Sequence, residues 1–357
     1  MNRLLSLPLD SSISFQLSFH ESGKYVATCI DCSCFVFEVD LAAPSPAYHE
    51  IKVAKDYLSG AKFVDARHII LGSGDGKLYV YNVFDELVIS TISSPPLKGL
   101  KGDGKRKPND IVCFDFATLR CLRRYFGEVE KRMVVFATLS REICVFDVTR
   151  IMDDAQFARR IGPIEATQLQ KMTGHFGSDI RCVSISGDGK FMAIGAEDNS
   201  FNIYCVSVRV VRNTRYHHSV RIEWVLLAKL FVRFDRHIHR VQWLDDRTLV
   251  ASTDAGNELH LAAMYEIRGC EGIIALLVEA LRRSDDRRVA ASERTMRLVA
   301  DVVLQYVLWI ILEYTTRVDF EGKISCIATC PDANDGAGLV VVGGFSNVLQ
   351  GIVPLAK

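Results

Sequence analysis

Internal repetition is the feature of this sequence that most restricts its fold. Four stretches share one pattern, in which three apolar runs are separated by a polar turn rich in Asp and Gly and then by a tight turn. These stretches are residues 17–39, 61–83, 183–206 and 241–263. Short apolar runs between such turns are typical of strands buried on both faces. Because each repeat is one supersecondary unit, the pattern predicts an all-β chain with one sheet per repeat.

The second turn of each repeat carries an aspartate, and a ring follows six residues later. The aspartates are Asp31, Asp75, Asp198 and Asp254, and the rings are Phe37, Tyr81, Tyr204 and His260. Aspartate suits this turn because its short side chain caps nearby amides and tolerates the tight geometry. The ring falls in the third strand, where a large planar side chain can pack between neighbouring sheets.

In these features the chain resembles the WD40-repeat family, whose repeats carry a turn aspartate, a tryptophan at the ring position and an upstream Gly-His pair. Gly174-His175 is the intact pair, and it precedes the repeat that holds Asp198 and Tyr204. The resemblance extends over nearly the whole chain. It implies a single β-propeller over residues 1–357, built from four-stranded blades.

The chain departs from the family pattern at several positions. No repeat contains Trp-Asp, and the nearest pair is Phe146-Asp147 in the third unit. In that unit Ser140 replaces the turn aspartate. Ile194 lies where the family often has a hydroxyl residue, so the buried hydrogen-bond network that the resemblance implies would be incomplete. The chain is therefore expected to be a degenerate member.

Counting the units predicts seven blades, with six as the alternative. The uncertain unit is 273–302, which fits either a helix or three strands. Its Leu, Ala, Arg and Glu favour a helix, but Asp285-Asp286 sits where a turn is due, so a blade is preferred. Residues 322–353 supply the last unit. A strand near residues 4–9 is expected to pair into it and close the ring, which removes exposed sheet edges.

The loop 93–110 is the first of two insertions. Its basic residues are Lys98, Lys101, Lys105, Arg106 and Lys107. It is either a solvated loop or an electrostatic contact for phosphate or an acidic peptide. A glycine spacing like that of a phosphate loop ends at Lys105. Nucleotide binding is nevertheless not expected, because Arg106 replaces the required Ser or Thr and Pro108 argues against a following helix.

Two other stretches flank the repeat at 183–206. The second insertion, 150–171, is amphipathic in parts and predicts a short helix, which serves either for partner docking or as a spacer. The stretch 209–240 contains eight Lys or Arg residues and two acidic residues; Arg209, Arg212 and Arg215 lie at its start. Interleaved aromatic residues fit stacking on single-stranded nucleic acid. The alternative is an outer strand pair whose arginines alternate toward solvent.

No catalytic, cofactor or metal site is expected. Cys29, Cys32 and Cys34 invite a zinc interpretation, but a structural site needs four ligands and no second Cys or His pair lies nearby in sequence. The trio also spans a turn inside a blade, where alternate residues point to opposite faces, so packing is preferred. No nucleophile elbow, zinc-protease helix or dinucleotide fingerprint occurs.

The composition excludes a strong global field, because 43 basic residues balance 43 acidic ones. Eleven cysteines, many in apolar runs, fit a reducing compartment, either cytoplasm or nucleus. The apolar segment 298–314 includes Asp301 and Gln305 and is shorter than the roughly 20 apolar residues that span a bilayer. Buried strands are therefore expected there rather than a membrane span.

The leading hypothesis for function is a non-catalytic scaffold or adaptor that binds other proteins as a subunit of a complex. It rests on the repeats, the neutral charge and the missing catalytic signatures. The alternative is a propeller that contacts RNA in a ribonucleoprotein for ribosome assembly or translation initiation. The run 174–204 looks similar to one blade of the propeller subunit of translation initiation factor three, and the basic stretch 209–240 would supply the contact.

Overall fold

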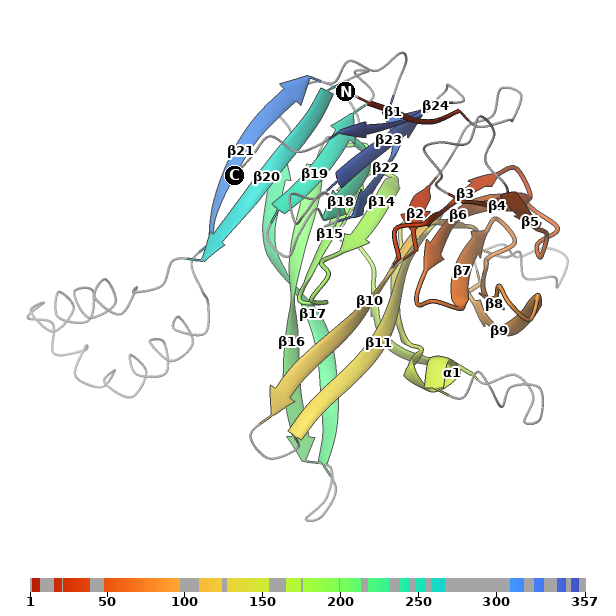
Figure 1. Cartoon of the computed structure of the whole chain (residues 1–357). Helices are drawn as coiled ribbons and strands as arrows, with labels where there is room; N and C mark the ends of the chain where they lie inside the picture. The colour runs from red at the N-terminus through yellow and green to blue at the C-terminus, as the bar shows by residue number, and fades with distance from the viewer. Residues whose placement is uncertain are drawn as a thin grey trace, which may run out of the picture. The chain divides into compact units, whose positions relative to one another are not determined.

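Strands make up nearly all of the regular structure in the described residues (Figure 1). The computed structural model describes residues 2–6, 16–20, 22–38, 48–96, 109–123, 127–153, 165–174, 176–198, 200–212, 218–231, 238–243, 248–253, 258–266, 309–317, 324–330, 339–344 and 348–352. The all-β class expected from the repeats is confirmed.

The strands form six four-stranded sheets. The first sheet contains β2 (Leu17–Phe19), β3 (Tyr25–Ile30), β4 (Ser33–Glu38) and β5 (Tyr48–Ile51), and the second contains β6 (Leu58–Phe63), β7 (His68–Ser73), β8 (Lys77–Asn82) and β9 (Leu87–Ser93). The third contains β10 (Ile111–Arg123), β11 (Gly127–Thr138), β12 (Ile143–Asp147) and β13 (Thr167–Met172), and the fourth contains β14 (Ile180–Ile185), β15 (Phe191–Ala196), β16 (Ser200–Arg212) and β17 (His218–Phe231). The fifth contains β18 (Ile238–Trp243), β19 (Thr248–Thr253), β20 (Glu258–Glu266) and β21 (Trp309–Arg317), and the sixth contains β22 (Ile324–Cys330), β23 (Leu339–Gly344), β24 (Val348–Ile352) and β1 (Asn2–Ser6). The three strands expected in each of the four repeats are present.

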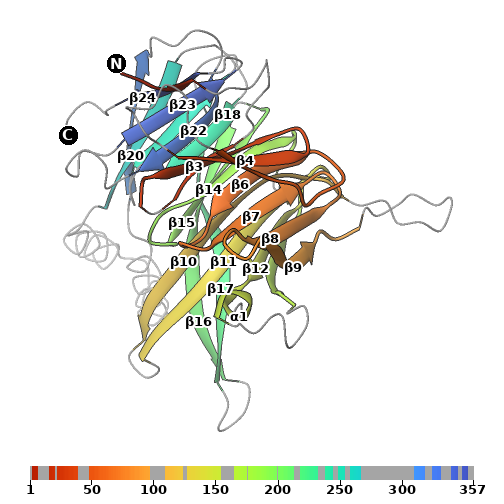
Figure 2. The ribbon, with the colours of Figure 1, turned by 45° about the vertical axis from the view of Figure 1, so that its right-hand side comes forward.

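The first strands of the six sheets form a closed ring. Each contacts the first strand of the next sheet, from β2 through β6, β10, β14 and β18 to β22, and β22 contacts β2. The remaining strands of the first five sheets follow outward from this ring in chain order, and in the sixth sheet β23 and β24 are followed by β1 (Figure 2). The expected β-propeller architecture is confirmed.

The sixth sheet is completed by the N-terminal strand, as predicted. β1 is antiparallel to β24, with Asn2 opposite Gly351 and Ser6 opposite Val348. The strand begins slightly before the predicted range, at Asn2. The edge of β24 is therefore paired rather than exposed.

Six sheets are present in the described residues, which is the smaller of the two expected counts. The unit expected at 273–302 lies outside them. The strands that precede and follow it in the chain, β20 and β21, are neighbours in the fifth sheet. The chain divides into two compact units: residues 1–261 with 315–357, and residues 262–314. The second unit is described only at its ends, which continue β20 and β21.

The core lies between neighbouring sheets. β7 and β15 are buried along their whole length, because a sheet stands on either side of each. This double burial explains why their sequences are nearly continuous apolar runs. Separate clusters fill the spaces between the first and second, second and third, and third and fourth sheets.

The expected insertions fall partly outside the described residues. Of 93–110, the residues 97–108 with all five basic side chains are not described. The short helix expected within 150–171 is α1, but it begins one residue earlier and spans only Thr149–Asp153. β13, which was included in that insertion, is instead the outer strand of the third sheet.

The apolar segment 298–314 ends in β21, a strand, and its residues 298–308 are not described. Among the residues that the structure describes, no helix has the length and apolar character that crossing a bilayer requires.

Candidate interaction surfaces

The turns of the sheets alternate between two sides of the ring, because neighbouring strands are antiparallel. One side, which we call the turn face, carries the second turns and the loops that lead into the first strands. One backbone bond recurs there in three sheets: Gly74 N–H donates to Tyr57 O, Leu139 N–H to Asp110 O and Glu197 N–H to Asp179 O, at 2.9, 2.9 and 3.0 Å. The turn face therefore holds its loop residues at equivalent, fixed positions.

The predicted turn aspartates lie on the turn face. Asp31, Asp75 and Asp198 occupy second turns, as expected, and Asp254 falls outside the described residues. Asp31 has a φ of 51°, a conformation that aspartate tolerates better than most residues. At Asp75 the carboxylate accepts the Tyr79 hydroxyl at 2.5 Å. The carboxylate of Asp75 therefore fixes a side chain of β8, a role that the sequence pattern did not predict.

The third sheet replaces the turn aspartate with Ser140, and a buried asparagine compensates. The Asn109 amide donates to Ser140 Oγ at 2.7 Å, and its oxygen accepts the Ser140 N–H at 3.2 Å. The next residue, Arg141, reaches the fourth sheet, with Nε 2.8 Å from Asp179 Oδ1 and a further bond to Gly177 O. Both links hold the turn without an aspartate.

Tyr57 and Asp110 meet on the turn face between the second and third sheets. The Tyr57 hydroxyl donates to Asp110 Oδ2 at 3.5 Å, and its backbone N–H donates to Asp56 Oδ1 at 2.8 Å. Burial raises the pKa of Asp110, and the nearby Asp56 and Asp75 carboxylates raise it further. Tyr57 and Leu139 are 36% and 54% exposed, so apolar surface borders these carboxylates.

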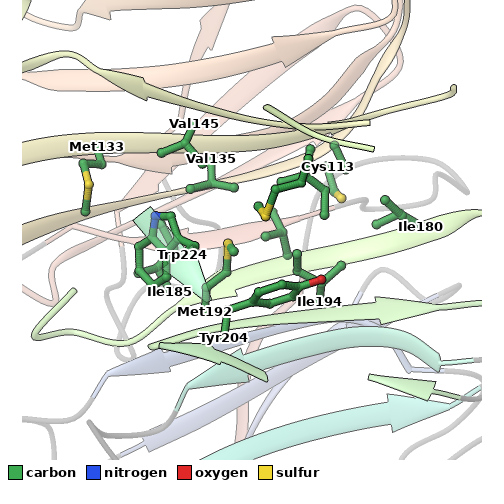
Figure 3. Close-up of a cluster of buried hydrophobic side chains, with 14 of the residues drawn as sticks. Cys113, Met133, Val135, Val145, Ile180, Ile185, Met192, Ile194, Tyr204 and Trp224 are labelled. Atoms are coloured by element: carbon green, nitrogen blue, oxygen red, sulfur yellow. The ribbon is translucent and has the colours of Figure 1, made fainter. Parts of the chain in front are cut away.

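Of the predicted ring residues, Phe37, Tyr81 and Tyr204 are buried, and the side chain of His260 is outside the described part of the structure. Tyr204 on β16 is fully buried in the cluster between the third and fourth sheets, together with Met192, Ile194 and Trp224 (Figure 3). Burial raises the pKa of Tyr204, while a hydrogen bond with Asn202 acts to lower it. At Ile194, where a hydroxyl was expected from the family pattern, the cluster is held by apolar contact. The upstream His175 lies outside the described residues.

Two long hairpins project from the other side of the ring (Figures 1 and 2). β10 and β11 have 13 and 12 residues, and β16 and β17 have 13 and 14. β12 pairs only with Met133–Ala137 of β11, and Phe191–Gly195 of β15 pair only with Phe201–Cys205 of β16. Residues 117–132 and 206–225 therefore contain two-stranded extensions, which we call the first arm and the second arm.

Both arms are braced where they leave the ring. Gly189, in the turn between β14 and β15, approaches the first arm so closely that a Cβ would lie 2.9 Å from Leu119 Cα. Leu119 is buried there, as are Ile222 and Trp224 of the second arm. Salt bridges also join Arg132 to Glu130 and to Asp153 of α1. The bases of the arms are thus part of the core.

The predicted basic residues are only partly placed. Arg209 and Arg212 lie on β16 in the second arm, and Arg215 falls in the undescribed reversal between β16 and β17. The register sets Arg209 opposite Arg221. The stretch 209–240 thus includes the outer strand pair that was one of its two expected forms. Lys98, Lys101, Lys105, Arg106 and Lys107 lie outside the described residues.

Two members of the cysteine trio are packed in the core. Cys29 and Cys34 are opposite one another on β3 and β4 and are buried, whereas Cys32 is exposed in the turn. Burial raises the pKa of the Cys29 thiol, with Cys34 adding to the effect. Within the described residues no group of three potential ligands is arranged to hold a metal ion.

Comparison with known proteins agrees with this architecture. The family model "WD domain, G-beta repeat" matches residues 166–205, which run from β13 to the start of β16. The chain is also similar to the β-propeller domain of Cps50 (Swd1) from Myceliophteria thermophila, with a TM-score of 0.53 and 9% identity over 99% of this chain and 100% of that one. No curated protein matches the sequence at a significant level.

The chain is a β-propeller in which one segment, residues 166–205, matches a WD40 repeat. Sequence reasoning missed one set of residues that ties its blades together. Asp115 on β10 is 1% exposed and accepts the Ile185 N–H of β14 at 2.8 Å. Its other oxygen lies 2.9 Å from Lys62 Nζ on β6. Asp115 thereby joins three neighbouring first strands.

The same position of the first strand links other blades. Ser18 Oγ accepts the Phe63 N–H at 3.0 Å, and Ser184 Oγ accepts the Trp243 N–H at 3.4 Å. In each case a polar side chain of one blade accepts a backbone N–H of the next blade. The sequence signal is a polar residue followed by a large apolar one near the end of the first strand, as in Lys62-Phe63, and it is present in the first five sheets.

Proposed function

We propose that this WD40 propeller is a non-catalytic scaffold that holds other proteins in a multiprotein complex. WD40 propellers typically serve as protein-interaction scaffolds, and the sequence carries no recognised catalytic motif. The observation that carries the proposal is the pair of arms. The ring is closed by the first strands and by β1, so the arms are not needed for closure.

The arms are suited to contact with a partner. A two-stranded ribbon is only marginally stable in water unless something packs on it. Among the described side chains, packing on the arms is found at their bases, at Gly189 and in the core around Trp224. A partner laid against the outer part of each ribbon would add contact area. The braced base would then keep the arm in a fixed direction and limit the entropy lost on binding.

Shortening each arm tests the proposal. One variant deletes residues 121–129 and joins Arg120 to Glu130, which are opposite one another, through Asn-Gly, a turn suited to hairpins. The other deletes 209–221 and joins Val208 to Ile222 in the same way. Both keep the buried residues at the bases. The readout is affinity purification from cells and mass spectrometry, with urea unfolding as the control for an intact ring.

We expect each shortened arm to lose a defined set of partners while the unfolding midpoint stays close to that of the full chain. An unchanged set of partners with both arms shortened would contradict the scaffold proposal. The same outcome is expected with ribonuclease present, because the partners are proteins.

Contact with RNA is a second candidate function, favoured by the register that sets Arg209 opposite Arg221. Two cationic residues at opposite positions repel unless an anion or solvent separates them. Charge reversal at Arg212 and Arg215, together with ribonuclease treatment, tests this candidate. If the partners disappear with the RNA and crosslinking to RNA falls in the variant, the RNA function takes precedence.

A reducing compartment, cytoplasm or nucleus, is part of the proposal. It is supported by the seven cysteines whose side chains the structure describes, which are free thiols, five of them buried. Fractionation of cells that express the tagged chain would test it.

A further inference from the structure

A patch of apolar and acidic side chains lies on the turn face, away from the arms. It consists of the exposed Tyr57, Leu139 and Asp56 and the partly buried Asp75 and Asp110, and we call it the Tyr57 patch. The Tyr57 hydroxyl donates to the Asp110 carboxylate at 3.5 Å, and the Leu139 N–H donates to the Asp110 carbonyl oxygen at 2.9 Å. Asp110 therefore joins the two apolar residues at one place on the turn face.

The patch is rigid. The Tyr57 ring lies against the backbone of Gly74, where a Cβ would be 2.2 Å from the ring atom Cε1, so no larger residue fits there. Gly74 N–H also donates to Tyr57 O at 2.9 Å. At the other end of the patch, the turn that carries Leu139 is fixed by the bonds between Asn109 and Ser140. A ligand would meet a preformed surface, which lowers the cost of binding.

Two carboxylates of the patch, Asp56 and Asp110, pair with no cation among the described residues. Asp56 and Asp75 lie close enough to Asp110 that both raise its pKa, after the larger effect of burial. Asp75 is already engaged, because it pairs with Lys77 at 3.7 Å and accepts the Tyr79 hydroxyl at 2.5 Å. Asp56 and Asp110 are therefore the groups that can accept hydrogen bonds from a donor that carries positive charge.

We propose that the Tyr57 patch binds an arginine-containing basic segment of a partner protein. The guanidinium lies over the Tyr57 ring and donates to Asp110 and Asp56, since a planar cation both stacks on an aromatic face and pairs with carboxylates. An apolar residue beside the arginine packs on Leu139. This proposal rests on the scaffold function and adds a second docking surface, on the side of the ring opposite to the arms.

Peptide binding to the full chain tests the proposal. The probe is a fluorescein-labelled pool of nine-residue peptides with a fixed central Arg-Leu and mixed flanks, and the matched probe has citrulline, which is uncharged, in place of arginine. Fluorescence anisotropy is followed up to about 1 mM protein, the range in which weak binding is still measurable. We expect the arginine pool to bind about tenfold more tightly than the citrulline pool and to weaken as salt is raised.

Variants locate the binding. Asp110→Asn and Tyr57→Ala should each weaken binding of the arginine pool about tenfold. Asp153→Asn, which removes a carboxylate of α1 on the arm side, should leave it unchanged. Because the pKa of Asp110 is raised, its charged form is disfavoured by folding at neutral pH, so Asp110→Asn is expected to fold at least as well as the parent. Loss of binding in that variant would therefore not reflect unfolding.

Equal binding of the two pools, or binding that Asp110→Asn does not weaken, would overturn the proposal. It would also be overturned if the arginine pool bound only after Lys98, Lys101, Lys105, Arg106 and Lys107 were replaced by serine, since the occupant would then be the chain's own loop. Partners lost on arm shortening would be unaffected by either result. Failure of the Tyr57 patch is thus distinguishable from failure of the scaffold function.

Discussion

The side-chain amide of Gln170 pairs with the backbone of Trp224 across two neighbouring sheets. Gln170 Oε1 accepts the Trp224 N–H at 2.7 Å, and Gln170 Nε2 donates to Trp224 O at 3.2 Å. Because β17 is the last strand of its sheet, this amide takes the place of a strand partner at one residue of the edge. The base of the second arm is thereby tied to the third sheet.

Replacing Gln170 by alanine should destabilise the propeller. Both Trp224 backbone groups would lose their partner in a partly buried place, which costs about 1–3 kcal/mol in the free energy of unfolding. Urea unfolding followed by tryptophan fluorescence measures the change. Gln168→Ala is the control, because Gln168 is exposed on the same strand, and it should change stability by less than about 0.5 kcal/mol. Equal effects of the two substitutions would show that the amide contributes nothing.

Removal of the Asp115 carboxylate should cost more. Asp115→Ala leaves Lys62 without its partner and the buried Ile185 N–H without an acceptor, and breaking a buried pair on one side costs about 3–5 kcal/mol. A double-mutant cycle with Lys62→Met, read by urea unfolding, separates the two contacts. We expect Asp115→Ala to be clearly less damaging in the Lys62→Met background. Strict additivity would mean that Lys62 and Asp115 do not interact.

The glycines provide a graded test of backbone geometry. Gly189 has a φ of 69° and no space for a Cβ, Gly23 has a φ of 68° with open space, and Gly177 has open space without a positive φ. Gly23→Ala should cost about 1–2 kcal/mol, the cost of the left-handed conformation. Gly189→Ala should exceed that, because the added methyl also meets the first arm at Leu119. Thermal unfolding of the three variants gives the order, and Gly177→Ala should be nearly neutral.

Cysteine reactivity should follow burial. Cys32 is exposed, whereas Cys113 and Cys182 are buried, which raises the pKa of the Cys182 thiol to about 11 and that of Cys113 further. Since the thiolate is the reactive form, iodoacetamide at neutral pH should label Cys32 in the native protein. The other two should be labelled only in urea. Peptide mapping by mass spectrometry measures the extent of labelling at each cysteine. Labelling of Cys113 in the native protein at the rate of Cys32 would contradict the placement of β10.

The sequence was sufficient for the repeats but not for the links between them. Turn residues such as Asp31 and ring residues such as Tyr204 recur at one spacing along the chain, so one sequence reveals them. Asp115 and Gln170 act on residues 70 and 54 positions away. The groups that they bind at those positions are backbone N–H groups, which every residue except proline has, so no residue type in the sequence marks them.

The arms were also beyond sequence reasoning, for a different reason. The run after Tyr204 continues to alternate like any strand, and the pattern does not reveal that β15 stops pairing at Cys205. The point at which β16 loses its pairing depends on where β15 begins, and the sequence of β16 does not contain that information. The same limit applies at the turn face, where Tyr57 and Asp110 come from different loops and meet only because the second and third sheets are adjacent.

The pairing of β1 with β24 has a consequence for the time course of folding. The blades from β2 to β17 each use strands that are consecutive in the chain, so they can form while synthesis continues. The last blade needs Ser6 and Val348 side by side, and pairings between distant parts of a chain form slowly. Until β24 emerges, β1 has no partner and the nascent ring stays open. A chaperone that shields β1 during this interval would therefore raise the yield of closed propeller without altering its final stability.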